Sequence, residues 1–452
     1  SRLWQAAQVE RTLDFMQAFE LNTLVLHEND IVDQLVLPSQ YFEEAQMLAR
    51  WPIRFARLWD NRVYMNQLIE KAKRRGIDVF FQTKEIWYPD PLLETHPELL
   101  NADGSICPTN PFWFQFVSDK MSDLLAHVPG FAGIVVSPGT RESRVSINAH
   151  GCSCERCSRT SAVEWYEHLL TAMFAPLNAA GKELVVRDFS WTADEQDEIL
   201  EGASRVSDQI VVQLKNTPHD FYPTFPDNPL IGRSGPHRQR IEYDSWGQFF
   251  GLGILPVSVA DDLRQRIIHA LANGADGIVF RTDWEIILDH SVFNSCNSVN
   301  LVAGAMLARH PDVQNKDIYG RWLDYGISSP LISGSYLAVP VAPQSHAEAL
   351  AGWQAYFDLA WEAIEKGIYA QGLVFHENSM FPDTLDKPYF YMTDFHGQDH
   401  WIPGASERVR ATNENIETLE QEKEEAAIAV SQLREALALD RQGLPAQLKE
   451  DL

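Results

Sequence analysis

The stretch Gln209-Ile210-Val211-Val212-Gln213-Leu214-Lys215-Asn216 is a short apolar run that ends in polar residues. Seven further runs share this character, at residues 22–28, 77–85, 131–137, 183–188, 240–244, 253–258 and 277–283. Mostly apolar runs of this length, rich in β-branched residues, are typical of parallel strands that are buried on both faces of a sheet. Helical stretches lie between most of them. The sequence therefore predicts a (β/α)₈ barrel, a TIM barrel, over residues 1–310.

The chain beyond the eighth run is predicted to be helical. Ala347 to Ile368 has apolar residues on one side of a helix. Past Gly404, the apolar residues of a charged, alanine-rich segment recur at near-heptad intervals, which predicts one long terminal helix. We expect a helical C-terminal domain over residues 311–452. Two interpretations of the terminal helix stay open, a homodimer contact and a helix that folds back on its own domain.

Composition limits the partners. The 452 residues carry a formal net charge of −26, which disfavours nucleic acids and anionic membranes because both attract basic surfaces. A small anionic ligand remains compatible, since a few cations in a pocket can reverse the local potential. No apolar run reaches the roughly 20 residues that span a bilayer, and no signal peptide is visible. These features predict a soluble chain and leave its compartment open.

Three of the five cysteines lie in the segment His150-Gly151-Cys152-Ser153-Cys154-Glu155-Arg156-Cys157. Thiolates from Cys152, Cys154 and Cys157 with the imidazole of His150 would complete a tetrahedral Zn²⁺ site. Three interpretations stay open. They are a structural zinc ion, a catalytic metal with an open position, and a metal-free loop with reduced thiols or one Cys–Cys bridge.

The polar ends of the runs predict the active site, because a TIM barrel places its site at the carboxyl ends of its strands. Paired carboxylates there suit glycoside hydrolysis, with one acting as acid and another as base or nucleophile. Aromatic rings suit the apolar faces of sugars, and cations suit either the protein's own carboxylates or an acidic sugar. Each of these residues also has an ordinary structural interpretation, as a hydrogen-bond acceptor or a core side chain. The catalytic candidates are Glu142, Asp220, Glu242 and Asp244, and the expected substrate contacts are Lys84, Glu85, Arg187, Asp188, Lys215, Asn216, Trp246, Gln248, Arg281, Asp283 and Trp284.

Residues 209–251 resemble the α-glucuronidases of glycoside hydrolase family 67. The likeness rests on Lys215-Asn216-Thr217-Pro218-His219-Asp220-Phe221, Asn228-Pro229-Leu230-Ile231-Gly232 and Ile241-Glu242-Tyr243. A weaker likeness extends from Leu13 to Asp312. The family's N-terminal β-domain has no counterpart in these 452 residues.

The resemblance implies that Glu142 is the general acid and that Asp220 is one of two candidate bases. It also implies that Lys215 and Arg187 contact a uronic carboxylate. The second family carboxylate is replaced by Gln248, so either Asp220 acts alone, or Glu242 or Asp244 on the sixth run takes the place of that carboxylate. A third cationic contact is replaced by Ser137. These departures indicate a relative with altered specificity.

The sequence thus predicts a glycoside hydrolase of polysaccharide degradation and carbohydrate metabolism, acting on a glycan with a uronic or other acidic sugar. Asn216 and Gln248 would bind hydroxyl groups, and catalysis would need no cofactor. Two alternatives remain. One is a polysaccharide lyase or metal-assisted carbohydrate enzyme, and the other is a glycan-binding barrel without catalysis.

Overall fold

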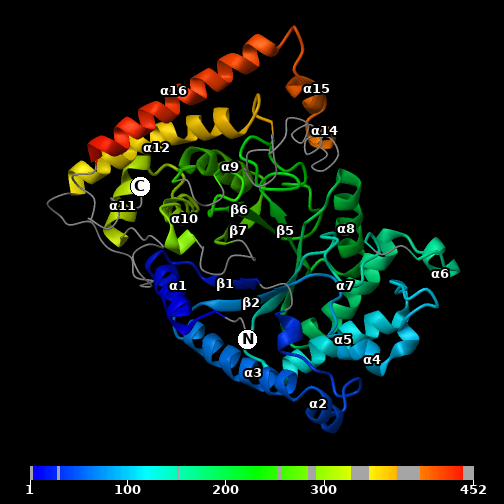
Figure 1. Ribbon diagram of the computed structural model, residues 1–452. Coiled ribbons are helices and arrows are strands. Elements are labelled where there is room, and N and C mark those ends of the chain that lie inside the picture. The colour runs from blue at the N-terminus through cyan, green and yellow to red at the C-terminus, as the bar shows by residue number, and fades with distance from the viewer. Residues whose placement is uncertain are drawn as a thin grey trace. The chain divides into compact units, whose positions relative to one another are not determined.

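The computed structural model describes residues 4–27, 31–149, 152–251, 256–283, 292–326, 346–373 and 398–440 (Figure 1). The strands are β1 (Thr23–His27), β2 (Asp78–Thr83), β3 (Gly133–Val136), β4 (Glu183–Arg187), β5 (Val211–Lys215), β6 (Gln239–Asp244) and β7 (Ala275–Arg281). The helices up to β7 are α1 (Ala6–Ala18), α2 (Glu44–Arg50), α3 (Pro52–Lys73), α4 (Pro91–Thr95), α5 (Pro111–His127), α6 (Glu155–Arg159), α7 (Ala162–Ala179), α8 (Ala193–Val206) and α9 (Ala260–Ala272). Those that follow are α10 (Ser298–Leu307), α11 (Asn315–Tyr325), α12 (His346–Ile368), α14 (Gln398–Trp401), α15 (Ala405–Val409) and α16 (Ile416–Asp440). Short 3₁₀ turns are η1 (Val32–Gln34), η2 (Pro97–Leu99) and η3 (Val292–Asn294).

The chain divides into two compact units. The first comprises Ser1–Val9, Leu21–Leu214 and Arg233–Arg240, and the second comprises Glu10–Glu20, Lys215–Gly232 and Ile241–Leu452. The first unit therefore holds β1 to β4 and nearly all of β5, and the second holds most of β6 and all of β7. The predicted domain boundary after residue 310 stays a prediction.

The first unit is an α/β layer structure in which β1 to β5 pair in parallel and in sequence order. Phe80, Val135, Val185 and Val211, one from each of four neighbouring strands, form a single buried cluster. Helices α5, α7 and α8 lie next to one another beside these strands (Figure 1). This is the arrangement that the doubly buried apolar runs predict.

Glycine is required where β3 passes β2. A Cβ atom on Gly133 would lie 2.3 Å from the Phe80 ring and 2.6 Å from the Glu183 carbonyl oxygen. A side chain there would force the strands apart, so Gly133 lets Phe80 fill the inner cluster.

The sheet has seven strands in the order β1 to β7, so the prediction of a closed eight-stranded barrel is wrong for the described residues. The strands match seven of the eight predicted runs, and the exception is the run 253–258. In that run, residues 253–255 lie outside the described residues, and Pro256 to Ser258 form no strand.

Side-chain amides take the place of a neighbouring strand at this point. Asn297 Oδ1 accepts from the Val257 N–H at 2.9 Å, and Asn300 Nδ2 donates to the Val257 carbonyl at 2.9 Å. The backbone polar groups of Val257 are thereby satisfied without sheet pairing, while Pro256 has no N–H to donate. The fold is TIM-like, with an irregular segment in place of the predicted seventh strand.

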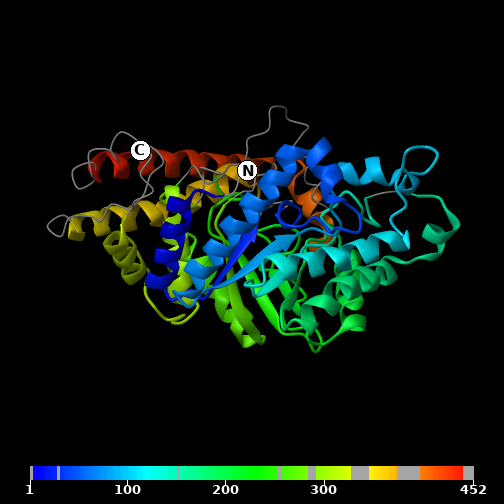
Figure 2. The same ribbon diagram turned by 90° about the horizontal axis from the view of Figure 1, so that it is seen from below.

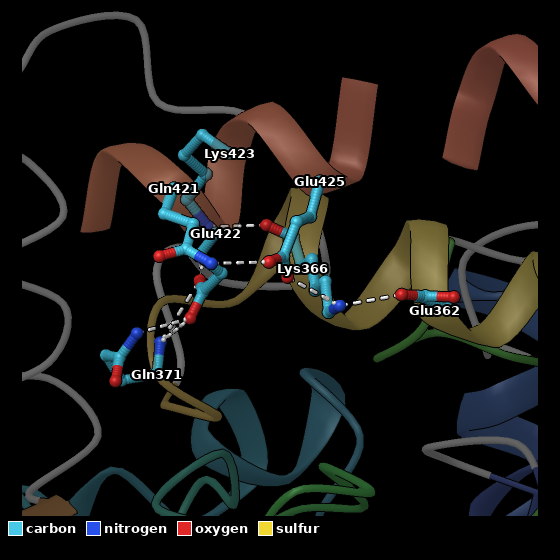
Figure 3. Close-up of polar contacts among 7 residues, drawn as sticks. All are labelled: Glu362, Lys366, Gln371, Gln421, Glu422, Lys423 and Glu425. Carbon is cyan, nitrogen blue, oxygen red and sulfur yellow. Dashed lines mark hydrogen bonds and ion pairs between the residues drawn. The ribbon is translucent and has the colours of Figure 1, made fainter. Parts of the chain in front are cut away.

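In the second unit, α12 and α16 lie side by side in both ribbon views (Figures 1 and 2). The Lys366 ammonium on α12 bonds to Glu425 on α16 at 2.8 Å and to Glu362 on its own helix at 2.6 Å (Figure 3). Lys423 on α16 donates to the Lys366 carbonyl at 2.6 Å. Glu422 accepts from the Gln371 N–H at 2.9 Å.

The terminal helix therefore folds back on its own chain, as one of the two interpretations expected. A homodimer contact through its other face stays a prediction. Among the described residues, no helix is both long enough and apolar enough to cross a membrane.

Candidate active site

In the first unit, a buried lysine at the end of β2 forms an ion pair with a carboxylate of the loop after β3. The Lys84 side chain is 6% exposed and the Glu142 side chain is 52% exposed, and Lys84 Nζ bonds to Glu142 Oε2. The carboxylate thus faces solvent with a buried cation behind it. This is an accessible position for a proton-transfer group.

Glu85, the next residue after Lys84, anchors the loop that carries Glu142. Its carboxylate accepts from the Gly139 N–H at 3.0 Å and from the Ser146 hydroxyl at 2.9 Å. Its own N–H donates to the Ser143 hydroxyl at 3.0 Å. Burial raises the pKa of Glu85, while these hydrogen bonds and the charge of Lys84 act in the opposite direction. These bonds hold the loop in place, and the predicted contact of Glu85 with substrate stays untested.

The residues at the end of β4 are also buried and bonded to neighbouring side chains. Arg187 is 6% exposed, and its Nη1 lies 3.5 Å from the Ser137 hydroxyl. The Asp188 carboxylate accepts from the Ser190 hydroxyl at 2.7 Å and from the Gln196 amide. Asp188 therefore stabilises the turn into α8, and its predicted contact with substrate stays untested.

In the second unit, β5 ends in another buried lysine that is paired with a loop carboxylate. Lys215 Nζ lies 2.8 Å from Asp220 Oδ1, and the side chains are 1% and 19% exposed. Lys215 also donates to the His219 carbonyl. His219 has a φ of 62°, and the Thr217 hydroxyl donates to the Asp220 carbonyl at 2.6 Å, so the turn is held from both ends. The loop thus holds the Asp220 carboxylate against the buried Lys215 ammonium, which balances its charge.

Asn216 follows Lys215 and carries an unused acceptor. Its side chain is 6% exposed, and its Oδ1 has no hydrogen-bond partner among the described residues. Its backbone is fixed, because its N–H donates to the Glu242 carbonyl at 2.9 Å and its carbonyl accepts from the Asn228 N–H at 2.9 Å. Glu242 on β6 is 5% exposed. A buried amide oxygen without a partner is a candidate acceptor for a ligand hydroxyl.

Asp244 at the end of β6 has a structural role in the loop that follows. Its carboxylate accepts from the N–H groups of Trp246 at 3.0 Å, Gly247 at 3.2 Å and Gln248 at 2.9 Å. Burial raises the pKa of Asp244, and the charge of Arg281 and these three bonds lower it. Three N–H donors occupy a carboxylate that cannot then readily reach a water molecule. The predicted catalytic role of Asp244 stays a prediction.

Arg281 at the end of β7 donates to the Gln248 amide oxygen. Its guanidinium lies 6.0 Å from the centre of the Phe221 ring, and the Lys215 ammonium lies 5.3 Å from the same ring. Two strand-end cations thus lie near one aromatic side chain, which is 4% exposed. Asp283 lies two residues beyond Arg281 in a non-strand segment, and Trp284 lies outside the described residues.

Trp246 is fully buried, and its carbonyl accepts from Asn297 Nδ2 at 3.0 Å. Its ring is part of the core behind the β6 loop. The predicted stacking of this ring on a sugar is not supported by its position, because a stacking platform must present one face to solvent.

The thiol cluster differs from the prediction in one ligand. The four groups that lie within 4.8 Å of one another are Cys107, Cys152, Cys154 and Cys157. His150 lies outside the described residues. Cys107 was missed because it stands alone in the sequence, 45 residues before Cys152. A single distant cysteine beside a C-x-C-x₂-C segment is the only signal that could have found it.

A cavity of about 720 Å³ lies between η1, α2 and α3 in the first unit, lined by Arg50, Trp51, Arg54 and Arg57 among others. Its acidic lining residue, Asp33, is buried and paired with Lys120 at 2.8 Å. None of the described site residues predicted from the sequence lines this cavity.

Neither a family model nor a curated protein matches the sequence. Among solved structures, the chain is similar to a GH138 enzyme targeting pectin rhamnogalacturonan II, at 14% identity and a TM-score of 0.56. The alignment covers 94% of this chain and 61% of that enzyme, so the chain spans about three fifths of its neighbour. An O-GlcNAc hydrolase from Thermobaculum terrenum aligns over 98% of this chain and 85% of its own, at 13% identity and a TM-score of 0.43.

The fold is therefore one found among glycoside hydrolases. The likeness to the GH138 enzyme shows the fold alone and does not single out family 67. The finer resemblance to α-glucuronidases stays a prediction.

Proposed function

We propose that this protein is a glycoside hydrolase whose substrate is a glycan with a uronic or other acidic sugar. The observation that carries the proposal is the Lys215–Asp220 pair at the carboxyl end of β5. There, a cation that is 1% exposed supports a carboxylate that is 19% exposed. The similarity of the fold to a GH138 enzyme targeting pectin rhamnogalacturonan II supports the choice of enzyme class and of a polysaccharide substrate.

In this proposal Asp220 is the base or the stabiliser of the oxocarbenium-like transition state. Lys215 orients it, and the fixed turn at His219 limits its freedom. Glu142 is the acid that protonates the leaving oxygen. Its ion pair with the buried Lys84 holds it at a solvent-facing position. The reaction needs no cofactor, and the thiol cluster has a structural role.

The acidic character of the substrate is inferred from the cations at the strand ends. Lys215 and Arg281 lie near the Phe221 ring, and each is a donor suited to a sugar carboxylate. Asn216 supplies a buried acceptor for a hydroxyl group. A neutral sugar could donate a hydroxyl group to Asn216, but it has no carboxylate to bind Lys215 or Arg281.

The test compares hydrolysis of matched uronic and neutral aryl glycosides by the parent chain and by Asp220→Asn. We expect turnover to fall by roughly 10² or more in this variant, whatever the leaving group, because the change removes the charge and keeps the shape. Asp227→Asn is the matched control, since Asp227 is a partly exposed carboxylate of the same unit, paired with Arg266 at 2.9 Å. Near-parental turnover by Asp220→Asn would contradict the proposed role.

The parent chain itself tests the enzyme class. Release of reducing sugar from acidic oligosaccharides supports hydrolysis, whereas an unsaturated product absorbing in the ultraviolet would indicate a lyase. Tight binding with no product would favour the glycan-binding alternative, which the replacement of a family carboxylate by Gln248 motivates.

A further inference from the structure

Four cysteine thiols converge in the first unit from segments that are distant in sequence. Cys107 is buried and lies in the loop between η2 and α5. Cys152 precedes α6, Cys154 is the residue that caps α6, and Cys157 lies within it. Four sulfur atoms within 4.8 Å of one another is an arrangement that side-chain packing alone does not require.

The spacing of the sulfur atoms matches a mononuclear tetrahedral site. Zn–S bonds of about 2.3 Å place the sulfurs of a tetrahedron about 3.8 Å apart. Cys107 Sγ lies 3.6 Å from Cys154 Sγ and 3.5 Å from Cys157 Sγ. These separations are far longer than the disulfide bond of about 2.05 Å.

N–H groups also point at the sulfurs. The Cys157 N–H lies 3.4 Å from Cys154 Sγ, and Asn101 Nδ2 lies 3.9 Å from Cys152 Sγ. Donors of this kind orient thiolate ligands and stabilise their charge around a metal.

The backbone around Cys107 is fixed by groups outside the cluster. The indole N–H groups of Trp113 and Trp165 donate to the carbonyls of Cys107 at 3.0 Å and of Pro108 at 2.9 Å. Arg156 Nη1 donates to the Thr109 carbonyl at 3.2 Å. Three successive carbonyls are thus bonded to rigid or helical neighbours. The fourth ligand is held in place before any ion binds, which is the condition for high affinity at small entropic cost.

We propose that Cys107, Cys152, Cys154 and Cys157 bind one Zn²⁺ ion in a structural tetrathiolate site. Four protein ligands leave no open position for water or substrate, so the ion has no direct part in catalysis. Its effect is to join the loop before α5 to the start of α6.

The zinc site would also fix the far end of the segment that follows the loop carrying Glu142. That loop is bonded to Glu85 through Gly139 and Ser146, and the chain reaches Cys152 six residues after Ser146. One end of the segment is fixed by a buried carboxylate and the other by the metal. This inference stands on the thiol geometry and does not depend on the proposed hydrolase activity.

The experiment measures metal content in the full chain, purified under reducing conditions without a metal-affinity step. We expect about one zinc per chain by elemental analysis, and its loss in Cys107→Ser. Cys296→Ser is the matched control, because Cys296 is the other buried cysteine and lies in the second unit. It should keep the zinc. Replacing zinc with Co²⁺ should give the intense visible absorption of tetrahedral thiolate coordination in the parent and not in Cys107→Ser.

If Cys107→Ser fails to fold, Cys152→Ser provides the test, because Cys152 is only partly buried and its substitution disturbs the core less. This variant should also lose zinc or bind it much more weakly. A parent chain without metal overturns the proposal, as does one in which the cysteines are paired by mass spectrometry. Full zinc content in either Cys107→Ser or Cys152→Ser excludes the four-thiolate site, and one iron per chain would overturn the choice of zinc.

Discussion

In the Lys215–Asp220 ion pair, the lysine is more deeply buried than the aspartate. This difference predicts how substitution of either residue changes the stability of the fold. The pair is 2.8 Å apart, with side chains 1% and 19% exposed. At an effective dielectric constant of about 20, its Coulomb attraction is about 6 kcal/mol, most of which offsets the cost of removing the charges from water. The net effect of a substitution therefore depends on which charge is left behind.

Asp220→Asn leaves an ammonium group with almost no access to water, and we expect it to lower the free energy of unfolding by about 3 kcal/mol. Lys215→Met leaves a carboxylate that water can still reach, and we expect a loss of about 1 to 2 kcal/mol. The double variant leaves neither charge, so its loss should be smaller than the sum of the two single losses by at least about 1 kcal/mol.

The assay is urea unfolding followed by tryptophan fluorescence and circular dichroism, with Asp227→Asn as control. Arg266, the partner of Asp227, keeps bonds to Asp262 and to the carbonyls of Pro223 and Phe225, so the control should lose less than about 1 kcal/mol. A larger loss in Lys215→Met than in Asp220→Asn would refute the burial argument. Additive single losses, within about 0.5 kcal/mol, would show that the two charges do not act as a pair.

Three further predictions follow from the first unit. Glu142→Gln should lower turnover by roughly 10² or more, least for substrates with good leaving groups. Glu94→Gln changes a similarly exposed member of a surface ion pair and should leave kcat unchanged. Burial raises the pKa of Glu85, so its contribution to stability is present below its unfolded pKa of about 4.3 and is lost as pH rises through the folded pKa. Glu85→Gln should therefore lose less stability than the parent as pH rises from about 4 to 7 in urea titrations, and an equal loss in both would contradict this. Gly139→Ala should lower the free energy of unfolding in urea by about 1 to 3 kcal/mol, because the new Cβ atom would lie 2.7 Å from a backbone carbonyl oxygen at a φ of +83°. Gly181→Ala is the control, since its backbone also has a positive φ but no atom of the described residues lies near the new Cβ. Equal losses in the two variants would refute the steric clash.

The strands were predictable because their signal is local. A run of apolar β-branched residues such as Val211 and Val212 indicates a buried strand without knowledge of its neighbours. The run 253–258 failed for the opposite reason. Its composition is suited to a strand, but the backbone of Val257 bonds to Asn297 and Asn300, which lie about 40 residues away. No local pattern reports such long-range amide contacts.

The candidate site was predictable in its residue types and less so in its pairings. Asp220 lies five residues from Lys215, and both are in one recognisable segment. Glu142 and Lys84 are 58 residues apart, and Cys107 is 45 to 50 residues from its thiol partners. The sequence placed the charged groups near strand ends and three of the four cysteines in one loop, and it missed Cys107. It could not show which charge neutralises which, because that depends on tertiary packing.

The Lys84–Glu142 and Lys215–Asp220 ion pairs alter how the cations at the strand ends should be interpreted. Lys84 and Lys215 are each more buried than the carboxylate they contact, so each cation supports a carboxylate of the protein. A sugar carboxylate would have to share Lys215 with Asp220 rather than find it unoccupied. Counting cations therefore overstates the affinity for an acidic sugar, and Lys215 would serve the orientation of Asp220 for any substrate. Selectivity for a uronic sugar would then depend on Arg281, which bonds to the neutral amide of Gln248. In the family that residues 209–251 resemble, a carboxylate stands at this position. The exchange of that carboxylate for Gln248 would remove a candidate base. It would also provide the contact that distinguishes an acidic substrate from a neutral one.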